Sequence, residues 1–506
     1  MAGVTVADLQ GCRESPDRGS CVQMSGSLRN HIDSAVGDGV EAVVKVKHRQ
    51  RLARLGWGRV YEPSPPGIWA GGDPEPRPGC SMEVLIDGAD AFPEMARAMR
   101  GAKRFVHLTG WHVAPAFELV RQRSPEIIGV LLAELAERVD VRVLVWSGAP
   151  IPAFHPTRKE VSAGIRNLTR DTRIRCEADP REHPFHCHHE KTIVVDGEVA
   201  FVGGIDLTSD AGDRFDSSAH EARRKLGWHD VTTKLRGPVV ADVNDHFSLR
   251  WKELTGEELQ RPEPPGPAGR TTVQVVRTVA EGMYDAVPHG DFRVFESYRR
   301  ALRSATRLIY LENQFLWAPE IVKILLDKLR NPPHPDFRLV VLLPAKANNG
   351  QDDTRGQLGV LAEADAGNGR MLAATIRSLS HGREDPLYVH AKVAVMDDRW
   401  LIVGSANLNA HSLFNDTEMC VVTDDAGLAR DTRVRLWAEH LQLDRDAVAG
   451  AEARALVDEH WIPIAREQLS RRESGAVATH RLLALPGVSR RSARLLGPLT
   501  GLIDDG

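Results

Sequence analysis

The sequence reads HEKTIVVDGEVAFVGGID at residues 189–206 and HAKVAVMDDRWLIVGSAN at residues 390–407. Each stretch has His, one residue, Lys, four residues, Asp, six residues, Gly-Gly or Gly-Ser, one residue, and Asp or Asn. The two histidines lie 201 positions apart (390 − 189), as do Gly203 and Gly404. A short motif found once is a weak signal, but the same motif found twice in phase indicates an internal duplication.

Each copy is predicted to form two strands joined by a tight turn. His189 and Lys191 are two residues apart, so both side chains project from the same face of an extended segment. An apolar run then leads to the turn signal Asp196-Gly197, and a second strand returns from it. At its end, Gly203-Gly204 would remove side-chain bulk where the returning backbone comes close to the site.

Together the two copies would supply imidazoles, ammonium groups, a hydroxyl, a carboxylate and an amide, from His189, Lys191, Asp206, His390, Lys392, Ser405 and Asn407. This set suits a phosphodiester. One imidazole can attack phosphorus, the other can protonate the leaving alkoxide, and the ammonium and amide groups can hold the phosphoryl oxygens. The lysines would supply the positive charge that a metal ion supplies elsewhere, so neither a metal nor a cofactor is expected. The alternative, surface pairs in a merely structural repeat, is disfavoured by two matching copies.

Apolar runs typical of buried strands alternate with helical patterns, and the elements that precede the first motif recur before the second. VRVLVW at 141–146 and FRLVVLL at 337–343 are such runs. The sequence therefore predicts one α/β unit used twice, each with a parallel or mixed sheet and helices on both faces. The expected organisation is a partly irregular leader (1–80), a first lobe (81–255), a Pro-rich linker (256–271), a second lobe (272–445) and a helical, Arg-rich tail (446–506).

The composition excludes several classes of protein. With 65 basic and 69 acidic residues the net charge is −4, which disfavours a dedicated nucleic-acid binder. The six cysteines lack the spacing of a disulfide framework or zinc finger, which favours reduced intracellular thiols. We find neither a secretory signal pattern nor the roughly 20 apolar residues of a membrane span. We expect a monomer in the cytoplasm that touches membranes at most from one side.

The stretch HPFHCHH at 183–189 has the composition of a metal site, with four histidines and one cysteine in seven residues. On a strand, however, adjacent side chains point to opposite faces, so only residues two apart could share an ion. No second pair of ligands lies at the usual spacing. An approach strand that carries one functional histidine is the favoured interpretation.

The duplicated HxKxxxxD motif, with its G-G/S-x-N/D tail, is identified as that of the phospholipase D superfamily. Similarity to eukaryotic-type phospholipases D covers about residues 80–445 and includes GWHDVTTKLRGPVVADVNDHFSLRW (227–251), IYLENQFL (309–316), FNDTEMCVV (414–422) and LWAEHL (436–441). The resemblance implies two pseudo-symmetric α/β/α sandwich lobes with mixed sheets and one active site between them.

The resemblance also implies roles for the motif residues. It implies a phosphohistidine on His189 and a general acid at His390. Phosphate would be bound by Lys191, Lys392 and Asn407, and Ser405 and Glu418 would support the site and orient a histidine. Asp196 and Asp397 are more suited to pinning the turns than to acting as acids. Asp206 could orient a neighbouring side chain. The glycines Gly203, Gly204 and Gly404 are expected near the substrate.

The first functional hypothesis is a phospholipase D that works at a membrane surface. It would hydrolyse glycerophospholipids, with phosphatidylcholine as the default, to phosphatidic acid and the free headgroup, and would transfer phosphatidyl groups to alcohols. The runner-up is a phosphatidyltransferase of the cardiolipin or phosphatidylserine synthase type. A nuclease is disfavoured by the charge, and a catalytically dead membrane-binding or scaffold protein by the two intact motifs. We expect no calcium- or phosphoinositide-binding module ahead of the core, because the first 80 residues are short and irregular.

Overall fold

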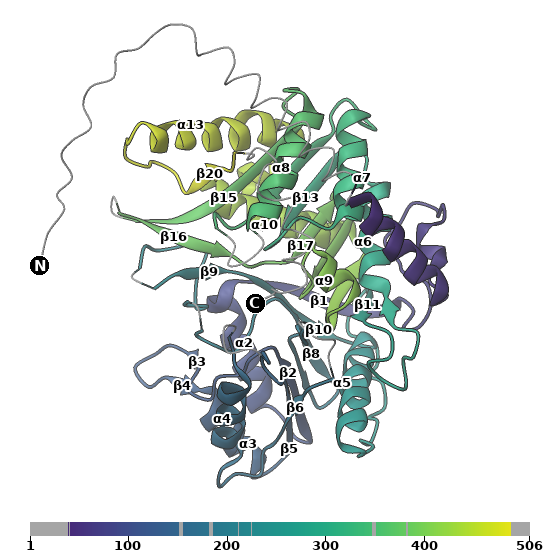
Figure 1. Ribbon diagram of the computed structural model, residues 1–506. Coiled ribbons are helices and arrows are strands. Elements are labelled where there is room, and N and C mark those ends of the chain that lie inside the picture. Colours follow the sequence, from purple (N-terminus) through teal and green to yellow (C-terminus); the bar gives the residue numbers. More distant parts are fainter. Residues whose placement is uncertain are drawn as a thin grey trace, which may run out of the picture.

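The computed structural model describes residues 39, 41–150, 155–181, 186–210, 212–223, 225–346, 351–380 and 383–486. The main β-sheet is mixed and continuous, and its two halves, joined by a short pairing of Arg77 with Val273 and of Cys80 with Thr271, form two lobes with helices on both faces, one below the other in Figure 1. The predicted α/β fold with two similar lobes is confirmed. Residues 1–38 of the expected leader and 487–506 of the expected tail lie outside the described residues.

The first lobe is built on a seven-stranded sheet with the order β6-β5-β2-β7-β8-β10-β1. Neighbouring strands β2, β5 and β6 run parallel, and the other pairs are antiparallel. The strands are β1 (Arg77–Ile86), β2 (Phe105–Gly110), β5 (Asp140–Trp146), β6 (Arg175–Asp179), β7 (Thr192–Val195), β8 (Val199–Gly203) and β10 (Val231–Arg236).

The second lobe repeats this sheet strand for strand, in the order β15-β14-β13-β17-β18-β19-β11. Its strands are β11 (Thr271–Val279), β13 (Leu308–Glu312), β14 (Arg338–Leu342), β15 (Met371–Ser380), β17 (Val393–Met396), β18 (Trp400–Gly404) and β19 (Glu418–Thr423). A further strand, β20 (Leu482–Ala484), pairs with β15 and brings the C-terminal region into this sheet. The duplication therefore covers the whole sheet and not only the two motifs.

Helices cover equivalent faces of the two sheets. The outer face of the first lobe is covered by α2 (Asp87–Arg100), α3 (Ile128–Ala136) and α4 (Arg158–Thr169), and that of the second by α6 (Arg293–Ser304), α7 (Pro319–Arg330) and α8 (Gln351–Asp365). One further helix in each lobe, α5 (Val239–Thr255) and α10 (Ala426–Leu441), contributes to a core shared by both lobes. The period of two along β8 explains this layering. Val199 and Phe201 join the outer core, whereas Ala200 and Val202 join a core shared by both lobes.

The remaining elements are short or lie in the C-terminal region: η1 (Gly58–Tyr61), β3 (Glu118–Val120), β4 (Glu126–Ile127), β9 (Gly227–His229), β12 (Asp291–Phe292), β16 (Arg383–Val389), α9 (Ala410–Phe414), α11 (Arg445–Gly450), α12 (Ala453–Leu456), η2 (Val457–Trp461) and α13 (Ile462–Glu473). A helix at 41–54 packs on the second lobe, where His48 Nδ1 lies 2.8 Å from Glu320 Oε1. Among the described residues, the helices are too short or too polar to cross a bilayer.

Candidate active site

The two motifs face each other because short strand pairings join the lobes beside each of them. β9 of the first lobe runs parallel to β16 of the second, and a single bridge links His188 with Thr417. The backbone N–H of His390 donates to the carbonyl of His229 at 2.8 Å. In the mirrored position, the N–H of His189 donates to the carbonyl of Thr417 at 2.9 Å. The entrance to each motif is thus held by the opposite lobe.

The two motif histidines form a pair, with ring centroids 6.4 Å apart and planes at 70°. Each ring is oriented by a carboxylate of the other lobe. His189 Nδ1 lies 3.1 Å from Glu418 Oε1, and His390 Nδ1 lies 2.6 Å from Asp230 Oδ2. An Nδ1–H that donates to a carboxylate leaves Nε2 as the ring nitrogen that can bond to phosphorus or carry a proton. Two reactive nitrogens therefore share one site.

The carboxylates are themselves supported by the Gly-Gly and Gly-Ser tails. The Ser405 hydroxyl donates to Glu418, and the Ser405 carbonyl lies 3.1 Å from His189 Nδ1. In the other lobe Gly204 stands at the position of Ser405. A Cβ on Gly204 would lie 2.2 Å from Asp230 Oδ1, far inside van der Waals contact. The missing side chain therefore makes room for the carboxylate that holds His390.

We expect Gly204→Ala to lower turnover by about 10²-fold, because it displaces Asp230 and with it the ring of His390. The added methyl group should also destabilise the fold by about 1–3 kcal/mol. The measurements are steady-state rates and thermal unfolding. Gly450→Ala is the control, since a Cβ there meets no atom within 4 Å. Equal rates in the two variants would contradict this role of Gly204.

Both lysines lie beside the histidine of their own motif. Lys191 Nζ donates to the carbonyl of His189 at 2.7 Å and lies 3.6 Å from Asp206 Oδ2. Lys392 Nζ donates to the carbonyl of His390 at 2.5 Å. Both lysine side chains are buried. The site therefore concentrates positive charge next to the two rings, which suits an anionic phosphodiester.

Gln314 connects the second lysine to the predicted amide ligand. Its Oε1 lies 3.4 Å from Lys392 Nζ and 3.5 Å from Asn407 Nδ2. Complete burial lowers the pKa of Lys392 to about 7, although Asp230 raises it. Lys392 is therefore the cation of the site whose charge changes near neutral pH.

The aspartates that complete the two motifs lie at the far end of their strands from the histidines. Asp196 has φ 57° and accepts hydrogen bonds from the backbone N–H groups of 103–105 at 2.7–2.9 Å. Asp397 has φ 55° and accepts from those of 306–308 at 2.7 Å. Each carboxylate ties the turn to a neighbouring strand. The structure does not bring either of them to the histidines.

The first glycine of each tail packs against a neighbouring strand. A Cβ on Gly203 would lie 2.4 Å from Thr232 Cα, and one on Gly404 would lie 2.3 Å from Cys420 Sγ. These two residues keep the central strands close together beside the site. Because glycine has no side chain, any contact that these two residues make with substrate would come from their backbone.

Sequence reasoning did not single out several side chains that surround His390. The Trp228 ring lies 4.6 Å from the His390 ring, and the guanidinium of Arg214 lies over Trp228 at 3.8 Å. Gln314 Nε2 donates to the Tyr388 hydroxyl at 2.8 Å. Burial lowers the pKa of His390 well below its usual range, and Lys392 and Arg214 lower it further. Without a bound anion these surroundings therefore favour the neutral form of His390.

Asp230 is held in place by a buried network that sequence reasoning also missed. Asp87 Oδ1 accepts from the backbone N–H of Asp230 at 3.1 Å and from His229 Nδ1 at 2.9 Å. His229 Nε2 lies 2.9 Å from Glu312 Oε2. Although burial lowers it, the charges of Asp87 and Glu312 raise the pKa of His229 well above its usual value. A buried imidazolium thus links the two lobes beneath the site.

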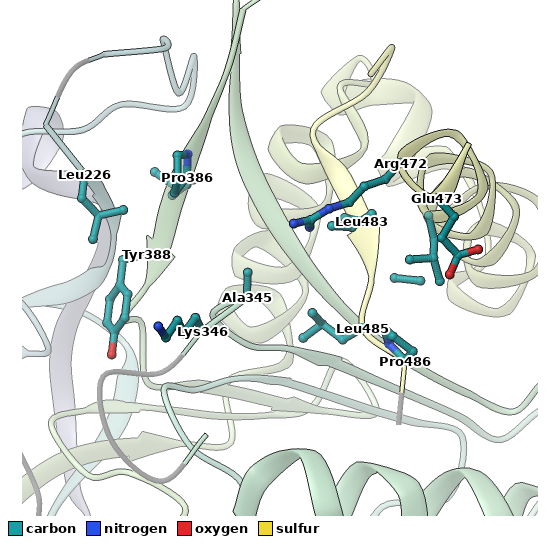
Figure 2. A pocket seen from close by; sticks show the side chains of 13 residues that line it. Leu226, Ala345, Lys346, Pro386, Tyr388, Arg472, Glu473, Leu483, Leu485 and Pro486 are labelled. Atoms are coloured by element: carbon teal, nitrogen blue, oxygen red, sulfur yellow. The ribbon is translucent and has the colours of Figure 1, made fainter. Parts of the chain in front are cut away.

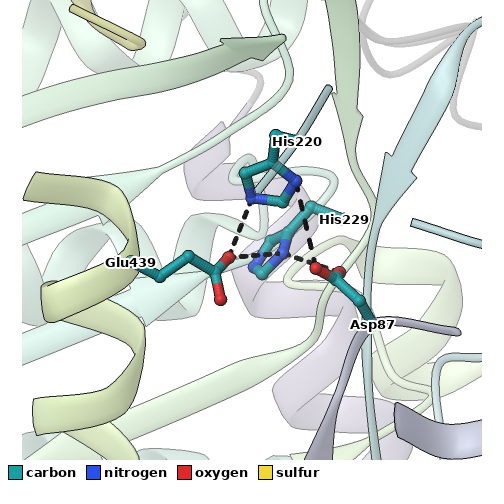
Figure 3. Close-up of side chains that lie close together, drawn as sticks. All are labelled: Asp87, His220, His229 and Glu439. Carbon is teal, nitrogen blue, oxygen red and sulfur yellow. Dashed lines mark hydrogen bonds and ion pairs between the residues drawn. The ribbon is translucent and has the colours of Figure 1, made fainter. Parts of the chain in front are cut away.

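The same network continues to His220 and Glu439 (Figure 3). His220 Nε2 lies 2.8 Å from Glu439 Oε1, and Asp216 Oδ2 lies 3.0 Å from His220 Nδ1. Burial disfavours the charged ring, but the bonds to Asp216 and Glu439 raise the pKa of His220 to about 9. These charges are compensated within the protein, which favours a supporting role for the network.

A cavity of about 1020 Å³ opens beside Tyr388 (Figure 2). Its wall is mainly apolar and is formed by both lobes and by the C-terminal strand β20, with Leu226, Pro386, Leu469, Leu483 and Leu485 among its lining residues. Lys346 and Arg472 also line it. Tyr388 lines the cavity, and its hydroxyl accepts from Gln314, whose Oε1 lies near Lys392 and Asn407, so this side chain stands between the cavity and the polar site.

Comparisons with known proteins agree with this geometry. Residues 98–227 match the family described as "Phospholipase D", and residues 298–439 match "Cardiolipin synthase, PLD-like domain". Phospholipase D A of Dictyostelium discoideum is 24% identical over 72% of this chain, and Phospholipase D1 of Schizosaccharomyces pombe is 24% identical over 74%. This chain covers 36% of the length of each of these two relatives.

Among solved structures, the phosphatidylserine synthase of Haemophilus influenzae Rd KW20 aligns with 70% of this chain and 84% of its own, at 12% identity and a TM-score of 0.48. The first family match runs from the end of α2 to the start of β9, and the second from within α6 to within α10, so that one falls on each lobe and together they cover more than half of the chain. The duplicated motif, the paired histidines and these two family matches agree: the chain belongs to the phospholipase D superfamily.

Proposed function

We propose that this chain is a phosphodiesterase of the phospholipase D type, which cleaves the bond between phosphorus and the headgroup oxygen of glycerophospholipids. The observation that carries the proposal is the paired arrangement of His189 and His390, each oriented by a carboxylate of the opposite lobe and each followed by a buried lysine. Such a site can provide a nucleophile, a general acid and a binding site for the phosphoryl oxygens at once.

In the first step, His189 Nε2 attacks phosphorus. The P–N bond forms as the P–O bond to the headgroup breaks, and His390 Nε2 gives its proton to the departing oxygen. Lys191, Lys392 and Asn407 hold the non-bridging oxygens, on which negative charge develops. The products are a phosphatidyl-histidine and the free headgroup alcohol.

In the second step, a water molecule attacks phosphorus and gives a proton to His390 Nε2. The P–N bond breaks, its electron pair returns to His189, and phosphatidic acid leaves. An alcohol in place of water would give a phosphatidyl alcohol by the same route. The site is thereby returned to its starting protonation state.

His390 must carry a proton when the headgroup leaves, although its pKa is low in the site without an anion. Lys392 and Arg214 contribute to this low value. A bound phosphodiester brings a negative charge that offsets both cations. The proposal therefore requires that substrate binding raise the pKa of His390.

The cavity next to Tyr388 supports a lipid over other phosphodiesters. Mainly apolar space of about 1020 Å³, bounded by a tyrosine that bonds to Gln314 of the polar site, suits a substrate with a charged phosphate and an apolar acyl region. The near-neutral composition, with a net charge of −4, does not favour a nucleic-acid backbone.

The first experiment is to incubate the protein with phosphatidylcholine vesicles and dilute ethanol. We expect phosphatidylethanol to form with the wild type and not with His189→Ala. His334→Ala, which changes a half-exposed histidine near Asp336, is the matched control and should keep the activity. If neither choline nor phosphatidylethanol appears with wild type, the proposed substrate is wrong, and other headgroups and labelled DNA become the next substrates.

Transfer of the phosphatidyl group to a physiological alcohol, as in a phosphatidyltransferase, is the second candidate. The second lobe matches a family described as "Cardiolipin synthase, PLD-like domain". The same vesicles offered serine or glycerol in place of ethanol would separate the candidates. A transferase should favour one of these acceptors over water, whereas a lipase should release phosphatidic acid regardless.

The pKa of Lys392, lowered by burial to about 7, predicts how substrate affinity varies with pH. The amine is charged below its pKa, so the ligand-free site loses a positive charge as pH rises through 7. We expect KM for a short-chain phosphatidylcholine to rise by up to about tenfold per pH unit above 7. In Lys392→Arg the charge persists, so KM should stay constant from pH 6 to 9. A constant KM in the wild type would contradict this role of Lys392.

A further inference from the structure

Three side chains with metal-binding atoms meet where the two lobes join, outside the pair of catalytic histidines. His186 precedes the first motif, His411 lies in α9 of the second lobe, and Asp416 comes just before β19. Their ligand atoms all lie within 4.8 Å of one another. His186 belongs to the stretch HPFHCHH, whose residues 183–185 lie outside the described part of the chain. Its partners His411 and Asp416 lie 225 and 230 residues further along the chain (411 − 186 and 416 − 186), and therefore could not be found by local spacing.

The contact between the two imidazoles is unusual because two nitrogens face each other. His186 Nδ1 and His411 Nδ1 are 2.9 Å apart. A carboxylate completes the triangle, since Asp416 Oδ1 lies 3.4 Å from His186 Nδ1. Two protonated rings could not face each other in this way, because both nitrogens would carry a hydrogen. At least one of the two nitrogens is therefore unprotonated and directs its lone pair toward the other ring, so a metal ion could take the place of the hydrogen between them.

We propose that His186, His411 and Asp416 bind a divalent transition-metal ion of the Zn²⁺ type. For zinc–nitrogen bonds of about 2.0–2.1 Å, tetrahedral ligands lie about 3.3 Å from each other. The observed separations of 2.9 Å and 3.4 Å are within a few tenths of an ångström of this value. Two imidazoles and one carboxylate leave the fourth position for water, a donor set that zinc also uses elsewhere.

Burial and charge favour a cation at this position. His411 and Asp416 are buried, whereas the side chain of His186 keeps 11% of its surface exposed, which gives an ion a route from solvent. With neutral imidazoles the cluster carries one negative charge. A divalent ion would compensate that charge and use the lone pairs of both rings.

The network around His229 contains similar residues, but its contacts do not favour a metal ion. There, His229 Nδ1 faces Asp87 and Nε2 faces Glu312, and both nitrogens of His220 face carboxylates. Imidazolium groups explain those contacts fully, and the rings of His220 and His229 are completely buried. The facing nitrogens and the partly exposed ring single out the cluster at His186.

An ion at this site would fasten together the two segments that lead into the active site. His186 is three residues before His189, and Asp416 is two residues before Glu418, which orients the ring of His189. The same segments are already joined by the N–H of Cys187, which donates to Asp416 Oδ1 at 3.0 Å. The ion would add a metal clamp beside this bond without contacting the reacting atoms.

The test uses the full chain without an affinity tag, stripped with a chelator and then dialysed against Zn²⁺. We expect about one equivalent of zinc by elemental mass spectrometry and a rise in the unfolding temperature of a few degrees. His186→Ala should lose both effects, and its unfolding temperature without zinc, compared with that of the wild type without zinc, shows whether the variant is folded. His334→Ala, outside the cluster, should behave as wild type.

Two further arms make the assignment specific. Asp416→Asn, which keeps the shape of the side chain, should weaken zinc binding at least tenfold. Zinc affinity should also fall from pH 7.5 to pH 5.5, because both rings must lose their protons to bind the ion. Wild-type protein that retains no zinc, or His186→Ala that retains as much as wild type, would overturn the proposal. These readouts do not depend on lipid turnover, so they are independent of the proposed function.

Discussion

Replacement of His189 by alanine is expected to lower phosphodiester turnover by about 10⁴–10⁶-fold, the range for loss of a nucleophile. The physical reason is that no other group replaces its Nε2 atom as the site of covalent capture. The measurement is rapid quenching with labelled lipid, followed by detection of an acid-labile phosphoryl group on the protein. His189→Ala should show no label, and His334→Ala should show the wild-type amount.

The partner variant, His390→Ala, separates the roles of the two rings. Without the general acid, turnover should fall by about 10²–10⁴-fold for a lipid with an ordinary alcohol headgroup. With a nitrophenol leaving group, which departs without a proton, the first step should recover and the covalent intermediate should accumulate. If the phosphoryl label survives in His189→Ala and disappears in His390→Ala, the roles of nucleophile and general acid are reversed. The lowered pKa of His390 in the ligand-free site, which favours a ring that can attack phosphorus, is the reason for this test.

Asp230→Asn is expected to approach the effect of His390→Ala, because Asp230 acts through this ring. Asp230 Oδ2 lies 2.6 Å from His390 Nδ1 and fixes which nitrogen carries the hydrogen. An asparagine has the same shape but can present an N–H₂ group to Nδ1, which would place the ring hydrogen on Nε2. By comparison with the same change in a serine protease triad, kcat should fall by as much as about 10⁴-fold.

The readout for Asp230→Asn is the division of the effect between kcat and KM. Because Asp230 acts through His390, kcat should fall while KM stays near the wild-type value. Glu418→Gln is the matched variant in the other lobe, where Glu418 faces His189. A wild-type kcat in Asp230→Asn would show that the carboxylate is not required to orient the ring.

The fold could be predicted because buried strands leave the same apolar pattern in both halves. The runs at 141–146 and 337–343 became β5 and β14, which occupy equivalent places in the two sheets. The sequence did not predict how the segment between the lobes packs against the rest of the chain. The Pro-rich stretch 256–271 was expected to be a linker, and in the structure the N–H of Ala268 donates to the carbonyl of Gly79 at 2.8 Å.

Asp230 could not be recognised from the repeat because it is out of phase. It lies 188 positions before Glu418 (418 − 230), whereas the motifs are 201 positions apart (390 − 189). The chain takes 27 residues from the end of β8 at Gly203 to Asp230 but only 14 from the end of β18 at Gly404 to Glu418. Insertions in loops hide such equivalence. A comparison of the residues where β10 and β19 begin would have found both carboxylates, since Asp230 directly precedes β10 and Glu418 is the first residue of β19.

The exchange of carboxylates between lobes has a consequence for how such a protein could arise. A single ancestral half would possess a histidine and a carboxylate that cannot reach each other, so it would be active only as a symmetric pair of identical copies. Fusion of the two copies into one gene would remove the dependence on dimer concentration. After fusion the two histidines could also evolve separately. Their surroundings now differ, since 14% of the His189 side chain is exposed but only 6% of the His390 side chain. This difference between the two surroundings permits one histidine to act as the nucleophile and the other as the general acid.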